Sequence, residues 1–218
     1  MLELAVKTLI AYLLGSALGS LIVGRLRGGI DIRTMGSGNA GGTNALRTQG
    51  SAFAAWVMLI DIGKGWIAAG VLPNLGLPQI AIDPAVSRDW LAVACASAVV
   101  LGHVNPVWYG FRGGKGAATL VGVLVGLDPV ALLPVLATWL LVVAATGFVG
   151  LATMLASVAY VLFLLGFERY SSDALLTFGI AMVALVCYTH RTNIERMRAG
   201  TENRAHRLWL LKPRSSPE

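Results

Sequence analysis

Charged residues are scarce in this chain of 218 residues. They make up 13% of it, whereas hydrophobic residues make up 56%, and the mean hydropathy is +0.71. A soluble domain carries about a quarter charged residues, so this chain has too few charges to cover a water-facing surface. The composition therefore excludes an ordinary soluble globule and a disordered chain, and it favours a protein that lies in a lipid bilayer.

Cysteine is also rare, and several regular patterns are missing. The two cysteines, Cys95 and Cys187, lie in apolar runs without the spacing of metal ligands or disulfides, so we interpret both as small core residues. The 26 glycines show no every-third-residue period, which excludes collagen. No strand-like alternation is sustained, so we expect the membrane-crossing elements to be helices.

Seven apolar stretches are candidates for these helices. Most are close to the length needed to cross a hydrocarbon core of about 30 Å. The long stretch 117–147 is interrupted by Asp128-Pro129, because proline cannot continue a helix, and it divides into a short helix and a longer one. We predict an all-α polytopic membrane protein with seven transmembrane helices. Their approximate ranges are 8–24, 52–72, 90–109, 117–127, 130–147, 151–167 and 174–189.

Basic residues gather in polar segments that seven helices place on one side of the membrane. Residues 25–50, residues 110–116 and the tail after residue 190 hold most of the 17 lysines and arginines, including Lys212 and Arg214 near the end. The positive-inside rule makes this side cytoplasmic, so we expect the N-terminus outside and the C-terminus in the cytoplasm. The remaining basic residues are Lys7, Arg88 and Arg169 on the opposite side and Lys64 within a helix.

The whole chain, residues 1–218, is expected to form one integral membrane domain. The first apolar stretch has only Lys7 ahead of it and no clear cleavage site before a soluble domain, so we interpret it as a retained span. Three polar segments on the predicted cytoplasmic side, residues 25–50, 102–119 and 190–204, contain the motifs with chemical potential.

The first motif is glycine-rich and spans residues 36–47, with the sequence GSGNAGGTNALR. Glycine lets a backbone approach a ligand and point successive amides toward it. Neutral donors and a forked guanidinium accompany the glycines, and the N-terminus of the helix that follows favours an anion. We interpret the motif as a cradle for a phosphate or carboxylate. Residues 36–41 also match G-x-G-x-x-G, the dinucleotide-binding fingerprint. That fingerprint needs a preceding strand, whereas an apolar helix is expected before residue 36, so we do not interpret the motif as a nucleotide site. The binding candidates are Ser37, Gly38, Asn39, Thr43, Asn44 and Arg47.

The second motif lies in residues 102–119. Lys115 stands among glycines at the start of an apolar helix, which suggests a second anion contact formed with Gly113 and Gly114. The spacing does not fit a Walker A loop. For His103, near the end of an apolar helix, a catalytic role and a helix-packing hydrogen bond both stay open.

The third motif leaves the last apolar stretch directly. His190 and Asn193 are three residues apart, so on a continuing helix they share a face and are able to grip a polyol or move a proton. The alternative is a basic flank with incidental polar residues. Inside the second stretch, Asp61 and Lys64 are also three residues apart, and we expect a structural ion pair.

Together the motifs resemble one family. The order GSGNxGxTNxxR (36–47), GHxxP with FxGGKG (102–116) and HxxNIxRxxxGxE (190–202) is similar to that of the PlsY family. These bacterial membrane enzymes move an acyl group from acyl phosphate to glycerol 3-phosphate. The similarity covers nearly the whole chain and implies a seven-helix fold in the bacterial inner membrane with a cytoplasmic active site. It also implies lysophosphatidic acid and phosphate as products, in the first acylation step of phospholipid synthesis.

The resemblance implies roles for the motif residues. Ser37, Asn39, Thr43, Arg47 and Lys115 would bind phosphate groups, and His190 and Asn193 would lie against glycerol 3-phosphate or the reacting centre. Glu202, at the end of the third motif, is a further binding candidate. Family members often have serines at the start of the sixth helix. This chain has Leu151-Ala152-Thr153-Met154 there, so Thr153 is a binding candidate that departs from the pattern.

The chemistry agrees with this set. Acyl phosphate is an activated mixed anhydride that needs charge neutralisation, orientation and help with one proton, and we expect no metal or cofactor. Either His190 or a substrate phosphate oxygen accepts the proton. Besides the substrates, the expected partners are the bilayer and an upstream enzyme that produces acyl phosphate, with no nucleic acid.

Two other functions share some of these features. A transporter or flippase for a phosphorylated solute would show an internal repeat and polar motifs at mid-membrane. This sequence shows no evident repeat, and its polar motifs are expected on one side of the membrane, which disfavours this alternative. A CDP-alcohol phosphotransferase would need several aspartates around a metal, whereas Asp61 is the one acid in a central intramembrane position.

Overall fold

The computed structural model describes residues 1–211, and these residues form helices joined by turns and loops. Within them, the one β-type contact is an isolated bridge between Leu77 and Ile80. The predicted all-α class is therefore confirmed for the described part of the chain. The contacts divide the chain into two compact units, Met1–Pro129 and the part from Val130 onward.

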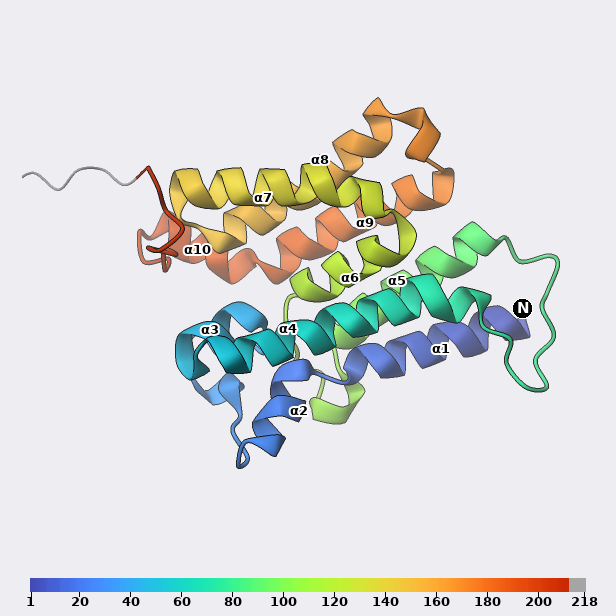
Figure 1. Cartoon of the computed structure of the whole chain (residues 1–218), viewed down its shortest axis with the longest axis horizontal. Helices are drawn as coiled ribbons and strands as arrows, with labels where there is room; N and C mark the ends of the chain where they lie inside the picture. The colour runs from blue at the N-terminus through green and yellow to red at the C-terminus, as the bar shows by residue number, and fades with distance from the viewer. Residues whose placement is uncertain (212–218) are drawn as a thin grey trace, which may run out of the picture. The chain divides into compact units, whose positions relative to one another are not determined.

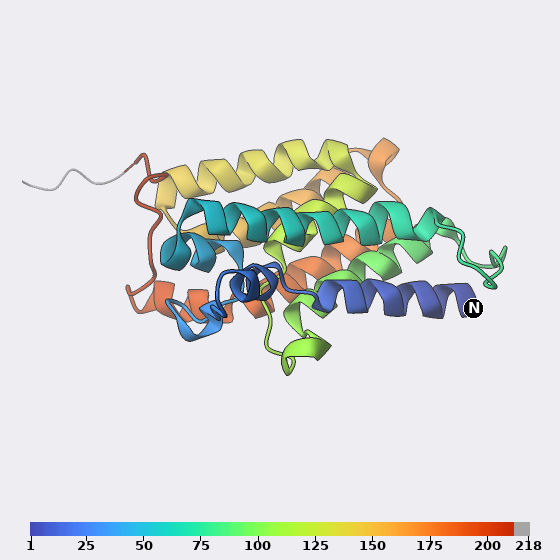
Figure 2. The same ribbon diagram turned by 60° about the horizontal axis from the view of Figure 1, so that its bottom comes forward.

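The first unit is organised around two pairs of packed helices. α1 (Leu2–Ser16) packs against α5 (Arg88–Val104), and α4 (Ser51–Trp66) packs against α6 (Ala117–Leu127). α1, α4 and α5 run along roughly the same direction (Figures 1 and 2). Close approach depends on glycine, because a Cβ on Gly102 would overlap the Tyr12 carbonyl and one on Gly122 would overlap the Ile62 carbonyl.

The first apolar stretch is not one straight helix. α1 ends at Ser16, α2 (Gly19–Leu26) begins after a two-residue break, and the two axes differ by 48°. The prediction of one continuous helix over residues 8–24 is therefore wrong. The helix begins earlier, at Leu2, and the chain changes direction at Ala17 and Leu18.

Two buried side chains of α4 bond the backbone at this break. Lys64 Nζ donates to the carbonyl oxygens of Gly15 (2.9 Å) and Ala17 (2.8 Å), and Asp61 Oδ1 accepts from the amide of Gly19 (3.1 Å). Helix ends leave such groups without intrahelical partners, and in hydrocarbon each costs several kcal/mol. The predicted Asp61–Lys64 ion pair is confirmed, with 2.9 Å between Nζ and Oδ1, and it stabilises the bend.

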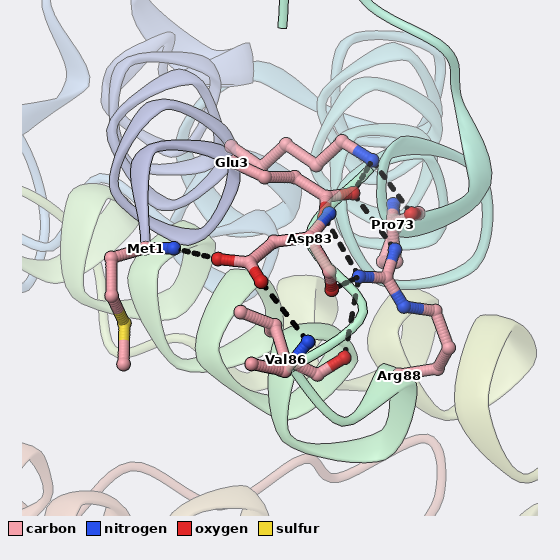
Figure 3. A network of polar contacts seen from close by, with 8 residues as sticks. Met1, Glu3, Pro73, Asp83, Val86 and Arg88 are labelled. Atoms are coloured by element: carbon pink, nitrogen blue, oxygen red, sulfur yellow. Dashed lines mark hydrogen bonds and ion pairs between the residues drawn. The ribbon is translucent and has the colours of Figure 1, made fainter. Parts of the chain in front are cut away.

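A second polar network lies where α1 and α5 begin (Figure 3). The buried Glu3 carboxylate accepts from both terminal nitrogens of Arg88 (2.8 and 2.7 Å), from Lys7 Nζ (2.8 Å) and from the Asp83 amide (2.9 Å). Lys7 also donates to the Pro73 carbonyl, at 2.7 Å. Lys7 and Arg88, which we expected on the same side, thus lie together around one carboxylate.

The second unit contains the later helices. α7 (Leu132–Thr146) packs against α8 (Val149–Gly166), and α8 packs against α9 (Asp173–Thr189). The predicted interruption at Asp128-Pro129 is confirmed, since α6 ends at Leu127 and the turn η5 (Pro129–Ala131) precedes α7.

The segment after residue 200 caps the C-terminal end of α7. Arg204 lies between the rings of Phe148 and Trp209, with its guanidinium carbon 4.3 and 4.1 Å from their centroids. Arg204 donates to the Thr146 carbonyl and Trp209 Nε1 to the Ala145 carbonyl, at 2.8 and 3.1 Å. The two basic residues predicted further along the tail, Lys212 and Arg214, lie outside the described residues.

Within residues 1–211, four helical segments are long and apolar enough to cross a membrane, or up to six if each bent pair forms one span. The bent pairs are α1 with α2 and α9 with α10 (Arg191–Arg198). α6, the predicted fourth helix, has 11 residues and is about 16 Å long, too short for a full span. The structure thus supports a polytopic membrane protein, whereas seven spans and the orientation of the termini stay predictions.

Candidate functional site

Asn44 organises the first glycine-rich loop from inside. Its side chain is fully buried, and Nδ2 lies 2.9–3.0 Å from the carbonyl oxygens of Ile32, Met35 and Asn39. Asn44 Oδ1 accepts from the Ser37 amide at 3.0 Å. The loop backbone occupies both ends of this amide, so Asn44 shapes the cradle instead of facing a ligand as we had expected.

Glycine conformation and an early helix complete the loop. Gly36 and Gly38 have φ of 56° and 71°, the left-handed region that favours glycine. The helix that follows the loop, α3 (Gly42–Gln49), begins inside the motif and is separated from α4 by Gly50. We expected the helix that follows to begin after the motif, and this detail is wrong. Arg47 on α3 reaches back to the loop, with Nη2 3.4 Å from Ser37 Oγ.

Arg33 connects this loop region to the second polar segment. Its Nε and Nη2 donate to the two Asp31 carboxylate oxygens, at 3.0 and 2.8 Å. Its Nη1 donates to the carbonyls of Tyr109 and Arg112, at 3.2 and 3.1 Å. The hydrogen bonds from Arg33 hold the pKa of Asp31 below its usual range. The Asp31–Arg33 pair was not predicted, although opposite charges two residues apart were an available signal in the sequence.

The second loop is built on the end of α5. The Gly113 amide donates to the Val104 carbonyl (3.1 Å) and the Gly114 amide to the His103 carbonyl (3.0 Å). These carbonyls lie in the last turn of α5, where intrahelical donors are absent. Gly116, with φ of 88°, precedes α6. Lys115, which is half-buried, therefore stands between the end of one helix and the start of another.

In the second unit, α9 does not continue through the third motif. It ends at Thr189, and α10 begins at Arg191 at an angle of 52°. The prediction that His190 and Asn193 share one face of a continuing helix is therefore wrong. His190 lies at the break, and its main-chain carbonyl accepts from the Asn193 amide at 2.9 Å.

The contacts of His190 define its tautomer. Nδ1 lies 2.8 Å from the Val186 carbonyl oxygen, and a carbonyl only accepts hydrogen bonds. Nδ1 therefore bears the proton, which places the lone pair of a neutral imidazole on Nε2.

Glu202 holds the side chain of Asn193. Its Oε1 accepts from Asn193 Nδ2 and its Oε2 from Arg196 Nε, both at 2.6 Å. A Cβ on Gly150 would lie 3.0 Å from Asn193 Cγ, so α8 packs closely against the same amide. Glu202, expected as a ligand contact, is engaged in orienting Asn193.

Thr153 has a hydroxyl already engaged inside the second unit. Its Oγ1 donates to the Val149 carbonyl (2.9 Å) and accepts from Trp139 Nε1 (3.3 Å). The hydroxyl proton is thus used within α8, and only its oxygen is available for a further contact.

The structure places the candidates in two groups, each within one unit. Ser37, Gly38, Asn39, Thr43, Asn44, Arg47, Gly113, Gly114 and Lys115 belong to the first unit, and Thr153, His190, Asn193 and Glu202 belong to the second. Ser37, Thr43 and Arg47 are exposed, whereas His190 and Asn193 are buried.

Comparison with known proteins gives one consistent result. The family model described as glycerol-3-phosphate acyltransferase matches residues 5–200. A glycerol-3-phosphate acyltransferase of Chlorobaculum tepidum is 39% identical, over 94% of this chain and 97% of the relative, and one of Chlorobaculum parvum is 38% identical, over 89% and 93%. The crystal structure of PlsY (YgiH), an integral membrane glycerol 3-phosphate acyltransferase in its glycerol 3-phosphate form, is similar with a TM-score of 0.79 and 34% identity, covering 92% of this chain and 94% of that one. The chain therefore belongs to the PlsY family of glycerol-3-phosphate acyltransferases.

Proposed function

We propose that this protein transfers an acyl group from acyl phosphate to glycerol 3-phosphate and releases lysophosphatidic acid and phosphate. The observation that supports this most is the pair of glycine-rich loops in the first unit. Each loop has a cation beside it, Arg47 or Lys115, and Arg33 bonds the two segments together. Such loops suit a reaction in which donor and acceptor both contain phosphate. The similar crystal structures are described as a glycerol 3-phosphate form and a lysophosphatidic acid form, which are the proposed acceptor and product.

The first unit supplies charge neutralisation in this proposal. The side chains of Ser37, Asn39, Thr43, Arg47 and Lys115 are assigned to phosphate oxygens. The amides of Gly38, Gly113 and Gly114, expected as further phosphate donors, instead donate to the carbonyls of Met35, Val104 and His103 and shape the two loops. Preorganised donors and cations of this kind stabilise the charge that develops on the departing phosphate.

The third motif supplies proton transfer and orientation. The glycerol hydroxyl oxygen attacks the acyl carbonyl carbon, the bond from that carbon to the phosphate oxygen breaks, and phosphate leaves with the electron pair. The hydroxyl proton moves to His190 Nε2 or to a phosphate oxygen. Asn193, whose amide is held by Glu202, orients the acceptor. Thr153 contributes at most an acceptor oxygen.

The same proposal includes the membrane arrangement. Residues 1–218 form one domain of seven spans in the bacterial inner membrane, with α6 as a short span, the N-terminus outside and the C-terminus cytoplasmic. The active site then faces the cytoplasm, where an upstream enzyme supplies acyl phosphate.

The test uses purified protein in detergent without added metal. Palmitoyl phosphate and radiolabelled glycerol 3-phosphate are supplied, with palmitoyl-CoA as a parallel donor, and lysophosphatidic acid is measured. Product from acyl phosphate alone is expected. Product from palmitoyl-CoA alone would overturn the donor, and no product from folded protein would overturn the activity.

Variants test the assigned roles. His190→Asn keeps a donor for the Val186 carbonyl but lacks Nε2, and we expect kcat to fall at least about 100-fold if His190 is the base. Lys115→Ala and Arg47→Ala should also reduce turnover strongly. Arg25→Ala, an exposed cation outside both loops, is the matched control with near-normal turnover. Near-normal rates in all three site variants would refute the assignment.

A further inference from the structure

A buried charged cluster extends from the break in the first span to the loop of Lys115. Asp61 and Lys64 come from α4 and His103 from α5, and all three side chains are buried. Lys64 Nζ lies within 3.0 Å of the Gly15 and Ala17 carbonyls, Asp61 Oδ1 and His103 Nδ1. The charged pair that bonds the helix break thus also contacts the imidazole of His103.

The contact with Lys64 defines the state of this imidazole. An ammonium group only donates, so the His103 Nδ1 at 3.0 Å accepts, and the proton of the neutral ring is on Nε2. The 3.5 Å from Nδ1 to Asp61 Oδ1 is too long for a good hydrogen bond. Lys64 is therefore the group that fixes the orientation of the ring.

The opposite edge of the ring lies against Gly114. A Cβ placed on Gly114 would overlap His103 Nε2, and its three nearest neighbours are all atoms of this ring. The main-chain carbonyl of His103 accepts the Gly114 amide at 3.0 Å. Side chain and main chain of His103 thus both restrain the residue that precedes Lys115.

We propose that His103 is a positioning residue: held by Lys64, it fixes the Gly113–Gly114 backbone and thereby directs Lys115. Two consecutive glycines have wide conformational freedom, so a phosphate-binding lysine that follows them needs an external support. The inference rests on the proposed function, because Lys115 is assigned there to a phosphate group.

A double-mutant cycle tests the contact directly. Gly114→Ala alone forces a methyl group into His103, and we expect the affinity for glycerol 3-phosphate to fall at least tenfold. In a His103→Ala background the space is free, so the same substitution should change affinity less than threefold. Equal effects in both backgrounds would overturn the proposal, because residues that do not interact give additive changes.

Gly63→Ala is the matched control. Gly63 lies on the same α4 helix as Lys64, and apart from its chain neighbours and the nearby backbone of α4 no atom lies within 4 Å of an added Cβ. Its substitution should change affinity less than twofold in both backgrounds, which separates the Gly114 effect from a general effect of alanine.

A second pair of variants separates the two edges of the ring. His103→Asn keeps an acceptor for Lys64 near the Nδ1 position but leaves the space beside Gly114 empty. His103→Gln fills the space beside Gly114 but has no acceptor near the Nδ1 position. We expect His103→Asn to have the higher melting temperature and His103→Gln the lower KM for glycerol 3-phosphate. A merely structural histidine would make KM worsen in step with the loss of melting temperature, and that result would overturn the proposal.

Binding and turnover are measured separately. Stabilisation of the protein by added glycerol 3-phosphate, followed by intrinsic tryptophan fluorescence on heating, reports affinity without any acyl donor. A wild-type protein that binds glycerol 3-phosphate but forms no product from acyl phosphate would refute the proposed donor and leave the cycle fully interpretable.

Discussion

Two buried charged clusters in the first unit differ in how completely their carboxylate is satisfied. Glu3 has partners on both oxygens, with Arg88 bonding each of them, Lys7 on Oε1 and the Asp83 amide on Oε2. Asp61 has Lys64 and the Gly19 amide on Oδ1, while its Oδ2 has no hydrogen-bond partner among residues 1–211. The Glu3 carboxylate therefore has two cationic partners, Lys7 and Arg88, whereas Lys64 is the one lysine or arginine bonded to the Asp61 carboxylate within residues 1–211.

The difference indicates separate roles. The Glu3 cluster joins the start of α1 to the start of α5 and to the Pro73 carbonyl. Within residues 1–211, the hydrogen bonds of Glu3, Lys7 and Arg88 reach no residue of the glycine-rich loops. The Asp61 cluster leads through His103 to Gly114. We therefore expect substitutions in the Glu3 cluster to change stability alone, and substitutions in the Asp61 cluster to change stability and phosphate binding together.

The largest expected effect comes from Lys64→Met. It leaves Asp61 buried without a cation and removes the donor for two helix-end carbonyls, so the free energy of unfolding should fall by about 3–5 kcal/mol. Lys7→Met is the matched variant. Glu3 then keeps Arg88 and the Asp83 amide, and the loss should be about 1–2 kcal/mol.

Unfolding in detergent, followed by tryptophan fluorescence, compares the two variants. Equal losses would contradict the view that Asp61 depends on a single lysine while Glu3 has redundant partners.

A somewhat smaller change is expected when the lone charge is also removed. Adding Asp61→Asn to Lys64→Met should recover about 1–3 kcal/mol of the loss, because no unpaired charge then stays buried. The asparagine oxygen still accepts from the Gly19 amide. If the double variant unfolds as readily as Lys64→Met alone, the penalty comes from the unbonded carbonyls of Gly15 and Ala17 and not from the charge.

Arg88→Gln sharpens the comparison from the other side. Loss of the paired hydrogen bonds to Glu3 should lower the melting temperature, but by less than Lys64→Met does, because Arg88 is partly exposed to solvent. The KM for glycerol 3-phosphate should stay within twofold of the wild-type value, since the described hydrogen bonds of Arg88 reach no residue of the loops. Steady-state kinetics at a temperature where both proteins are folded would check this, and a tenfold rise in KM would show that the two clusters are coupled.

The sequence was informative where a contact is local. Asp61 and Lys64 are three residues apart on one helix, and the ion pair followed from that spacing. The interruption at Asp128-Pro129 followed from the geometry of proline. The breaks at Ala17-Leu18 and His190 were not predicted, because hydropathy reports composition and not helix direction. Arg88 reaches Glu3 across 85 positions, and no local pattern predicts such a contact.

The site shows the same limit. The motifs located the loops and their cations. In sequence, the side-chain amide of Asn44 is equally suited to bind a ligand or to bond the loop backbone. The structure shows the second role, because Asn44 Nδ2 bonds three loop carbonyls. For His103 a packing hydrogen bond and a catalytic role were both open in sequence. The structure gives the hydrogen bond to Lys64 and adds the contact with Gly114, which depends on how the chain returns to the end of α5.

The smallest expected effect concerns Asp31 and Arg33, a partly exposed ion pair that contacts the second polar segment. Because Arg33 lowers the pKa of Asp31, the pair stabilises the fold above the unfolded pKa of about 4, and this contribution disappears as pH falls through the lower folded value. Asp31→Asn should therefore destabilise by at most about 1 kcal/mol at pH 7, and wild type and variant should converge as the pH falls below the folded pKa of Asp31. Melting temperatures measured across this range test the sign. If the two melting temperatures still differ at low pH, Asp31 stabilises the fold through the geometry of its hydrogen bonds and not through its charge. The charge of this exposed pair would then contribute nothing, unlike the charges of the two buried clusters.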